Sequence, residues 1–300
     1  MGRKPESFFE WDGPRQHYQH GGHEGWLPLF YQHNETFASL HRASFDAVAA
    51  ALPTEDLVPY RWVDGSALVM VQAFRYHEVT WTGPDGSQGQ MVPYGEISVA
   101  AAATIGPAPP VLPLLKPRLA GFVLHLPVTT REARDGGREV YGFPKFLADM
   151  DFTEAPDSRG VRLSEGGRDI LTLTVSTGGP VVPDRRPMLA YTAKDGQLWE
   201  TVVPVLAHVQ PRVGGRSGRL ELGDHGVARR LQALEVSAAP LAVFNYLDHR
   251  SILPGPSRSV GTARPYPAFP GRDEEFARYT VRHPRTPALN QYPATQPVPA

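Results

Sequence analysis

Hydrophobic and polar residues alternate along much of the chain with the period of a β-strand, and this pattern predicts most of the secondary structure. Seven segments have strand-like apolar runs or alternation: residues 67–81, 95–103, 120–128, 169–176, 201–209, 218–223 and 231–237. Turn-forming clusters separate several of them, as in GPDGS (83–87), EARDGG (132–137) and SEGG (164–167). The sequence therefore predicts many short strands joined by turns.

One segment has a helical pattern instead. Residues 42–52 (RASFDAVAAAL) are predicted to form a helix, and Pro53 marks its end. Helices are otherwise few, and 29 glycines stand beside 31 prolines. The order lacks the alternation of strand and helix of a nucleotide-binding fold, and no phosphate-cradling glycine loop is present. We expect a mainly β protein with a closed or sandwiched antiparallel sheet.

The charge balance and the absence of cysteine exclude several classes of protein. The 30 basic residues are matched by 31 acidic ones, so no net field favours nucleic acid or an anionic membrane. The chain has no cysteine, which excludes disulfides, thiolate chemistry and cysteine-ligated zinc. The longest uncharged run, residues 97–115, carries four prolines, too many for a membrane helix. The N-terminus lacks the apolar core of a signal peptide, so we expect a cytoplasmic protein.

Both ends of the chain differ from its middle. Residues 1–25 are polar and rich in His and Gly, and are expected to form an arm. His17, His20 and His23 are spaced three apart, but no helix aligns them, so a solvated arm is favoured over a metal cluster. Residues 262–300 contain prolines every few positions and are expected to be an extended tail. The catalytic or binding domain is then residues 26–261, with no metal or cofactor expected.

Lys145 is the residue with the clearest chemical potential. It follows Pro144 and stands among Tyr141, Phe143 and Phe146. Lysine is ordinarily protonated at neutral pH, because its pKa is near 10.4, but apolar surroundings disfavour the ammonium. A neutral amine adds to a ketone and gives an iminium, which accepts the electrons left by decarboxylation or deprotonation. From the residues alone, a lysine that snorkels to the surface is the simpler interpretation.

The segment around Lys145 resembles a known family. GGREVYGFPKFLADMDF (136–152) is similar to the active-site segment of the acetoacetate decarboxylase superfamily, in which GRE precedes an aromatic-Pro-Lys sequence. Residues 33–53, 93–103 and 218–239 also resemble segments of this family, in the same order, over residues 27 to 260. The resemblance implies that Lys145 forms the Schiff base and that Glu96 is a buried active-site carboxylate beside it. It also implies a closed β-cone or barrel with a few peripheral helices, and a homo-oligomer.

Three polar positions of the family's pocket are replaced in this chain. Phe146 stands where a second lysine is usual, Asn34 replaces an arginine and Gln72 replaces a glutamate. Losing the arginine removes a charge-assisted partner for a substrate carboxylate. Arg75 or Arg118 would restore it if either reached the pocket, although both are more simply solvent-facing strand residues. Asn34, Gln72, Phe146 and Tyr141 are therefore the predicted substrate-binding residues. Phe146 is also expected to keep water from the amine.

Other residues of the matching segments are expected to be structural. Arg138 and Glu139, of the GRE sequence, should fix the approach to the Pro-Lys turn. His125 lies in an apolar strand, and Asp224 and His225 belong to the late matching segment. An isolated histidine in such a setting is more often a hydrogen-bonded core residue than a ligand.

Three functions remain open at this point. The first is a Schiff-base lyase that acts on a 2-oxo or 3-oxo acid, for example by decarboxylation. The second uses the same iminium and enamine for aldol, dehydration or cyclisation chemistry on a 2-oxo acid. The third is a family member that binds a ligand without turnover, which the retained Lys145 disfavours. The expected partner is a small keto acid, and acetoacetate itself is not expected to be the main substrate.

Overall fold

The structure is a computed structural model, and it describes residues 5–20, 22–106, 119–256, 258–271 and 281–282. Three α-helices and a short 3-10 helix accompany nineteen strands in these residues. The helices are η1 (Pro5–Phe9), α1 (Phe45–Ala51), α2 (Arg131–Tyr141) and α3 (Gly226–Ala233). The strands are β1 (Gln16–His20), β2 (His23–Leu27), β3 (Leu29–Ala43), β4 (Leu57–Pro59), β5 (Ala67–Thr82), β6 (Gln88–Met91), β7 (Tyr94–Ile105), β8 (Leu119–His125), β9 (Asp149–Ala155), β10 (Ser158–Glu165), β11 (Arg168–Ser176), β12 (Val182–Asp184), β13 (Met188–Lys194), β14 (Gln197–Val203), β15 (Val205–Val213), β16 (Gly218–Leu222), β17 (Ala242–Leu253), β18 (Arg258–Thr262) and β19 (Val281–Arg282).

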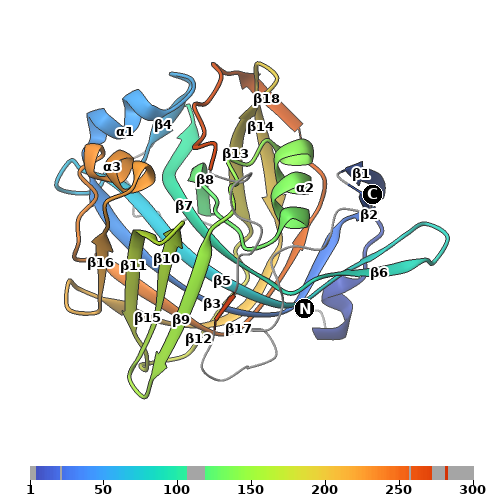
Figure 1. Ribbon diagram of the computed structural model, residues 1–300, viewed down its shortest axis with the longest axis horizontal. Helices are drawn as coiled ribbons and strands as arrows, with labels where there is room; N and C mark the ends of the chain where they lie inside the picture. Colours follow the sequence, from blue (N-terminus) through green and yellow to red (C-terminus); the bar gives the residue numbers. More distant parts are fainter. Residues whose placement is uncertain (1–4, 21, 107–118, 257, 272–280, 283–300) are drawn as a thin grey trace.

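A twelve-stranded sheet forms the body of the protein (Figure 1). Its order is β12-β15-β17-β3-β5-β7-β8-β13-β14-β18, with β4 beside β7 and β6 beside β5. All of its pairs are antiparallel except β8 with β13. The predicted mainly β, antiparallel character is confirmed. In the described residues, however, the sheet keeps two edges and does not close into a barrel. Its edge strand β12 is only three residues long and contains Pro183, which has no N–H to donate to a neighbour.

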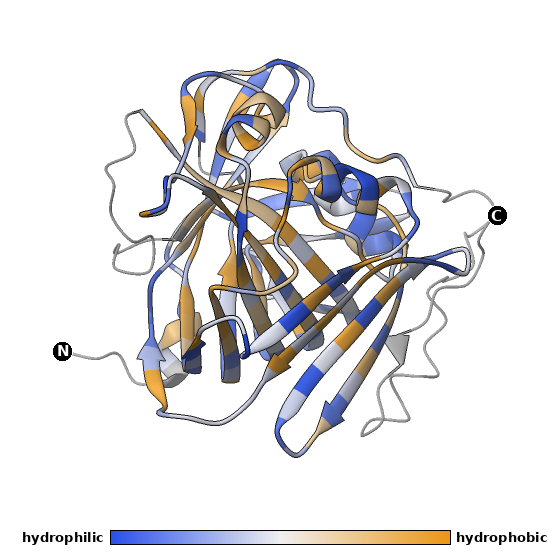
Figure 2. Cartoon of the chain, turned by 90° about the vertical axis from the view of Figure 1, so that its left-hand side faces the viewer, coloured by the Kyte–Doolittle hydropathy of each residue, from blue (hydrophilic) through white to orange (hydrophobic). Residues whose placement is uncertain are grey.

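A smaller sheet, β16-β11-β10-β9-β19, covers one face of the large sheet. The main core lies between the two and holds apolar side chains from both, such as Phe37 of β3 against Phe152 of β9. Hydrophobic and hydrophilic residues alternate along the strands, as Figure 2 shows, because successive side chains of a strand point to opposite faces. The opposite face of the large sheet carries α2 and the candidate site.

Most segments predicted from periodicity form the expected elements. The helix at residues 42–52 is α1, and the strands at 67–81, 95–103, 120–128, 169–176 and 218–223 correspond to β5, β7, β8, β11 and β16. The strand predicted at 201–209 is wrong in one respect, because Pro204 divides it into β14 and β15.

Two other predictions of secondary structure are wrong. Residues 132–137 form part of α2 and not a turn, because Ala133, Gly137 and Tyr141 recur every four residues and bury one face of a helix. The strand predicted at 231–237 begins inside α3, where Val227, Ala228 and Leu231 are buried at helical spacing. The helical spacing was present in both segments. Two glycines obscured it in residues 132–137, and a short apolar run obscured it in residues 231–237.

The two ends of the chain are partly ordered. Within the expected arm, β1 and β2 form an antiparallel hairpin that pairs His17 with Trp26. Within the expected tail, residues 263–271 lie against the domain. Tyr266 donates a hydrogen bond to the Leu124 carbonyl over 3.0 Å, and Phe269 packs on Phe146. No helix in the described part of the chain is long and apolar enough to cross a membrane.

Three buried histidines predict how stability depends on pH. Burial lowers the pKa of His41 to about 4, of His125 to about 3 and of His249 to about 4. Between pH 6.5 and these values the unfolded chain binds protons that the folded chain does not, so the free energy of unfolding falls as pH falls. From pH 6.5 to pH 5 we expect a loss of roughly 1.5 kcal/mol for each histidine, measured by urea unfolding. His125→Met should flatten this slope by about a third, and equal stability at pH 7 and pH 5 would contradict the prediction.

Candidate active site

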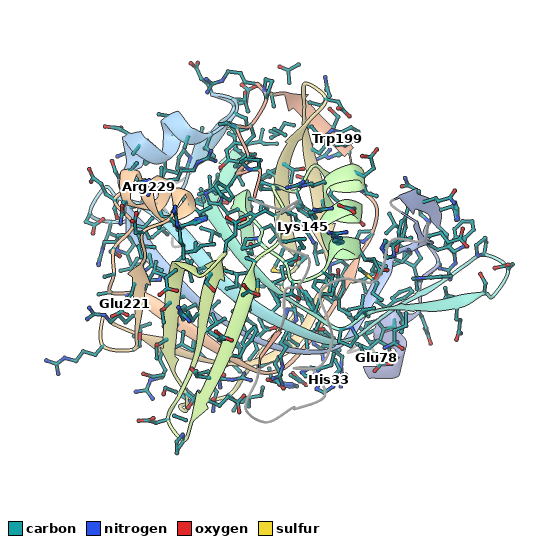
Figure 3. The ribbon with its side chains drawn as sticks, viewed as in Figure 1. His33, Glu78, Lys145, Trp199, Glu221 and Arg229 are labelled. Carbon is teal, nitrogen blue, oxygen red and sulfur yellow. The ribbon has the colours of Figure 1, made fainter. Side chains whose placement is uncertain are left out.

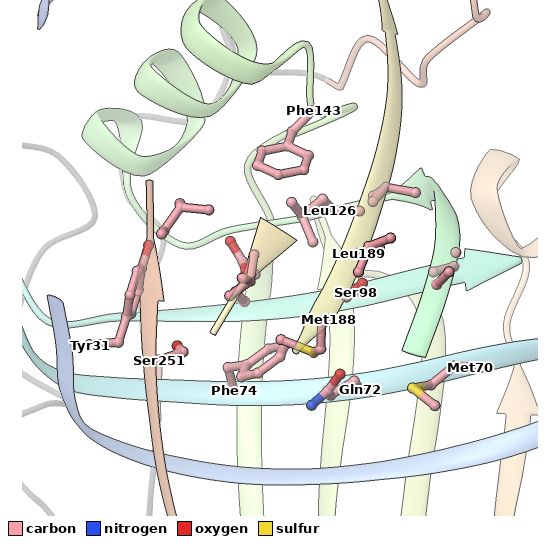
Figure 4. A pocket seen from close by; sticks show the side chains of 18 of the residues that line it. Tyr31, Met70, Gln72, Phe74, Ser98, Leu126, Phe143, Met188, Leu189 and Ser251 are labelled. Atoms are coloured by element: carbon pink, nitrogen blue, oxygen red, sulfur yellow. The ribbon is translucent and has the colours of Figure 1, made fainter. Parts of the chain in front are cut away.

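A cavity of about 160 Å³ opens on the face of the large sheet that carries α2. Strands β3, β5 and β7 form one wall, and β8, β13 and β17 approach from the other side (Figure 4). Its lining is mostly apolar, with a few polar groups near one end. The described lining residues are Tyr31, Leu40, Met70, Gln72, Phe74, Tyr76, Glu96, Ser98, Ala100, Ala102, Ala120, Gly121, Val123, Leu126, Phe143, Lys145, Met188, Leu189, Ala190, Val203, Ser251 and Leu253.

Lys145 reaches this cavity from the loop that follows α2, in the interior of the protein (Figure 3). Gly142 ends the helix with a φ of 66°, a left-handed conformation that a side chain would disfavour. The turn then returns on itself, since the Lys145 N–H donates to the Phe143 carbonyl over 2.8 Å. Arg138 of α2 donates from Nε to the Lys145 carbonyl over 2.6 Å. The helix thereby fixes the backbone of the lysine, as predicted for Arg138, whereas Glu139 is exposed.

The amine of Lys145 lies against a carboxylate inside the protein. Its Nζ is 2.7 Å from Oε2 of Glu96, and Lys145 is only 4% exposed. The other oxygen of Glu96 accepts a hydrogen bond from the Tyr76 hydroxyl over 3.1 Å. The rings of Phe143 and Tyr94 lie 5.8 Å and 5.9 Å from Nζ, within the range of a cation–π contact. Glu96 is therefore the group placed to take a proton from the amine.

Three tyrosines form the floor of the site and remain protonated. Burial and the charge of Glu96 raise the pKa of Tyr31 and Tyr76, and burial raises the pKa of Tyr94 well above its ordinary value. The Tyr31 and Tyr94 hydroxyls are 3.0 Å apart. The ring of Tyr76 packs against both of their rings, with centroid distances of 4.5 Å to Tyr31 and 4.7 Å to Tyr94. Tyr76 donates to Glu96, and Tyr31 and Tyr94 pack against the ring of Tyr76, so these protonated phenols support the carboxylate and do not serve as bases.

One glycine of α2 makes room for the lysine stem. A Cβ added at Gly137 would stand 2.5 Å from both Cδ and Cε of Lys145 and 3.1 Å from its Nζ. Those distances are shorter than carbon atoms tolerate, so an alanine here would push the amine aside. Gly136, in the same helix, has no atom within 4 Å of such a Cβ. Gly137 therefore makes room for the side chain of Lys145, whereas Gly136 does not contact it.

Comparisons with known proteins identify the family of this chain. A sequence model of the acetoacetate decarboxylase family matches residues 17–244. This chain belongs to the acetoacetate decarboxylase family. A solved acetoacetate decarboxylase is 19% identical over 78% of this chain and 90% of its own, with a TM-score of 0.55. The acetoacetate decarboxylase from Legionella pneumophila is 17% identical over 85% of this chain and 94% of its own, with a TM-score of 0.55.

A third solved structure with the same fold is an enzyme of enduracididine biosynthesis. The enduracididine biosynthesis enzyme MppR, complexed with the condensation product of pyruvate and imidazole 4-carboxaldehyde, is 13% identical. The match covers 78% of this chain and 89% of that one, with a TM-score of 0.55. At this identity the likeness concerns the fold alone. A search of curated proteins returns no match.

Of the residues at which this chain departs from the acetoacetate decarboxylase pattern, Gln72 lies in the cavity. Its amide projects from β5 into the cavity near Met70 and Phe74 (Figure 4). Asn34 is buried outside the described lining, and its amide donates to Nδ1 of His249 over 3.3 Å. Asn34 was predicted to bind substrate, but it could influence a substrate in this cavity only through another side chain.

Phe146 and Tyr141, the two aromatic residues predicted to bind substrate, lie in different places near Lys145. Phe146 is fully buried in the main core, where it packs edge-on against Phe269, and it is not among the described lining residues. Tyr141 lines a smaller cavity of about 30 Å³ on the other side of Lys145, and its hydroxyl donates to the Pro254 carbonyl over 2.7 Å. Phe143 does line the larger cavity, and the centre of its ring lies 5.8 Å from Nζ of Lys145.

Neither Arg75 nor Arg118 is among the described residues that line the cavity. Arg75 is 1% exposed, so the expectation of a solvent-facing residue is wrong. Its guanidinium lies on the opposite face of β5 from Gln72 and Phe74, and pairs with Glu35. Arg118 lies outside the described residues.

Sequence reasoning missed several residues that the fold brings to the site. Ser98 follows Glu96 by two positions, so the strand period alone places it on the same face. Ser251 comes from β17, and no local signal connects it with Lys145. His225 has a structural role, as predicted, since it caps α3 by accepting from the Val227 N–H and pairs with the buried Glu165.

Proposed function

We propose that this protein is a Schiff-base-forming lyase that acts on an oxo acid, with Lys145 as the nucleophile. The observation that carries the proposal is the buried amine of Lys145, which faces a cavity and is held 2.7 Å from the carboxylate of Glu96. A surface lysine would be exposed and hydrated, whereas this one is enclosed by the rings of Tyr94 and Phe143. Membership of the acetoacetate decarboxylase family supports the same chemistry.

The proposed reaction uses the side chains of Lys145 and Glu96, the substrate and water. Glu96 accepts a proton from Lys145, and the free amine attacks the carbonyl carbon of the substrate. The carbinolamine formed loses water and leaves a protonated imine. In a 3-oxo acid, the electrons of the bond to the carboxylate then move to the imine nitrogen, which gives carbon dioxide and an enamine. Protonation of the enamine carbon and addition of water release the ketone and restore Lys145.

The same enamine supports a second reaction. An enamine that meets an aldehyde instead of a proton forms a carbon–carbon bond. The lining of the cavity is mostly apolar and extends along β5 and β7 away from Lys145, which favours a second reactant or a larger substrate. Structures of MppR with pyruvate and with a pyruvate condensation product have the same fold. We place lyase chemistry first, because the alternative needs a second reactant and no residue in the described lining is assigned to it.

Borohydride trapping tests the nucleophile directly. With pyruvate or acetoacetate, reduction should add the mass of the reduced substrate to the peptide that carries Lys145. The chain has four lysines, Lys4, Lys116, Lys145 and Lys194, so peptide mapping distinguishes every candidate. Lys194→Arg, outside the cavity lining, should label like the parent protein. Labelling that persists in Lys145→Ala would remove Lys145 from this role.

A further inference from the structure

We infer that the preferred substrate is a 3-oxo acid with an apolar tail of about five to eight carbon atoms. This inference rests on the proposed function, since it specifies what the carbonyl that reaches Lys145 carries. It follows from the shape, the lining and the charge of the cavity. Acetoacetate, whose tail is a single methyl group, would leave the apolar part of the lining that lies far from Lys145 without a contact.

The cavity extends along the strands away from Lys145. Glu96, Ser98, Ala100 and Ala102 alternate with core residues on β7, so all four face the cavity. Six residues of strand span about 20 Å. On the neighbouring strand the register pairs Phe74 with Glu96, Gln72 with Ser98 and Met70 with Ala100. The polar groups thus lie at the lysine end, and the lining becomes apolar with distance from it.

Small side chains keep the far part of the cavity open. Ala100 and Ala102 of β7 face it, whereas Ala101 and Ala103 of the same strand are fully buried in the main core. The described lining also includes three further small residues, Ala120, Gly121 and Ala190, from the opposing strands β8 and β13. The run of four alanines in the sequence therefore has two functions, since one half packs the core and the other half leaves space for a ligand.

The length of the lining indicates the size of that ligand. The cavity of this protein is about 160 Å³, with Leu40, Met70, Met188 and Val203 in its lining. An extended tail of five to eight carbons would reach along the apolar part of this lining, and its burial provides the binding energy that a small acid lacks.

The charges of the lining favour loss of the substrate's carboxylate. Among the described lining residues, Lys145 is the one cation and Glu96 the one anion, and they are paired. Gln72, Ser98 and Ser251 offer neutral hydrogen bonds. A 3-oxo acid gives up its charge as carbon dioxide and leaves a neutral ketone that suits apolar walls. A 2-oxo acid that keeps its carboxylate would leave the charge without a partner there.

A chain-length series of 3-oxo acids tests the inference. We would measure carbon dioxide release, corrected for spontaneous decarboxylation, from acetoacetate to 3-oxododecanoate. Each methylene buried should raise kcat/KM about threefold to fourfold until the cavity is full. We expect a maximum between 3-oxooctanoate and 3-oxoundecanoate, at least a hundredfold above acetoacetate. A flat series, or a maximum at acetoacetate, would overturn the inference, as would a preference for 2-oxooctanoate over 3-oxooctanoate.

Two variants show whether the cavity sets the preference. Ala102→Leu fills the far end, and should lower the ratio of kcat/KM for 3-oxodecanoate to that for acetoacetate at least tenfold. Thr104→Val, on the same face of β7 beyond the lining, should keep the ratio of the parent protein. An unchanged ratio in Ala102→Leu would overturn the inference.

Trapping separates this inference from the proposed function. If borohydride traps both 3-oxodecanoate and acetoacetate on Lys145 but the chain-length series is flat, the nucleophile stands and the substrate class is wrong. If no oxo acid of the series is trapped on Lys145 and none is turned over, both are wrong.

Discussion

Gly137→Ala should lower kcat/KM at least about a hundredfold while the protein remains folded. The new methyl group would lie 2.5 Å from Cδ and Cε of Lys145, so the lysine stem must move and carry its amine away from Glu96. A misplacement of about 1 Å at a reacting group is enough for a hundredfold loss. Imine formation, followed by borohydride trapping at a fixed time, should fall in parallel with turnover.

Gly136→Ala is the matched control for this substitution. Its Cβ would meet no atom within 4 Å, and alanine is the better residue in the interior of α2. We expect activity like that of the parent protein and a gain of up to about 1 kcal/mol in the free energy of unfolding. Equal losses of activity in the two variants would mean that α2 as a whole, and not the contact with Lys145, controls the site.

Glu96→Gln should reduce kcat by about two to four orders of magnitude, the range attributed to one positioned proton-transfer group. The amide keeps the size of the side chain and can still receive the Tyr76 hydroxyl bond, but it does not accept the ammonium proton of Lys145. Raising the pH supplies hydroxide in place of the carboxylate. Borohydride trapping on Lys145 should therefore recover in alkaline solution, while turnover recovers only in part because later proton transfers still lack Glu96.

Tyr76→Phe tests the hydrogen bond to Glu96 separately from the carboxylate itself. It removes the hydroxyl 3.1 Å from Oε1 of Glu96 but leaves the carboxylate beside Lys145. The loss of this one bond should change kcat about tenfold or less, with no rescue by alkali. If Glu96→Gln shows the same small loss and no rescue, Glu96 is a structural partner of Lys145 and not its proton acceptor.

The sequence determined the type of most elements through periodicity. Residues 67–71 form a continuous apolar run at the start of β5, because a strand that is buried on both faces is apolar at successive positions. The Pro-Lys turn was identified by the resemblance of residues 136–152 to the family, since the residues alone favoured a lysine at the surface. Glu96 was placed beside Lys145 by resemblance to the family, and no local feature of β7 indicates it.

Helix α2 shows where the local signal failed. Two adjacent glycines favour a turn, but the burial of Ala133, Gly137 and Tyr141 and caps at both ends stabilise the helix once the sheet is present. Gly137 is required there by a contact with Lys145, which lies eight residues further along the chain. Such a requirement is invisible until the turn after α2 brings the lysine back against the helix.

Only the tertiary structure decided which side chains share the cavity. Gln72 and Arg75 are three residues apart on one strand, yet one faces the cavity and the other pairs with Glu35 on the opposite face. The face of β5 that meets the core is decided by the smaller sheet that packs against it. The strands that surround the cavity, β5, β8, β13 and β17, are brought into one sheet by pairings between residues far apart in sequence. The period of a strand fixes which residues lie together on one face, and only the packing of the two sheets fixes what that face meets.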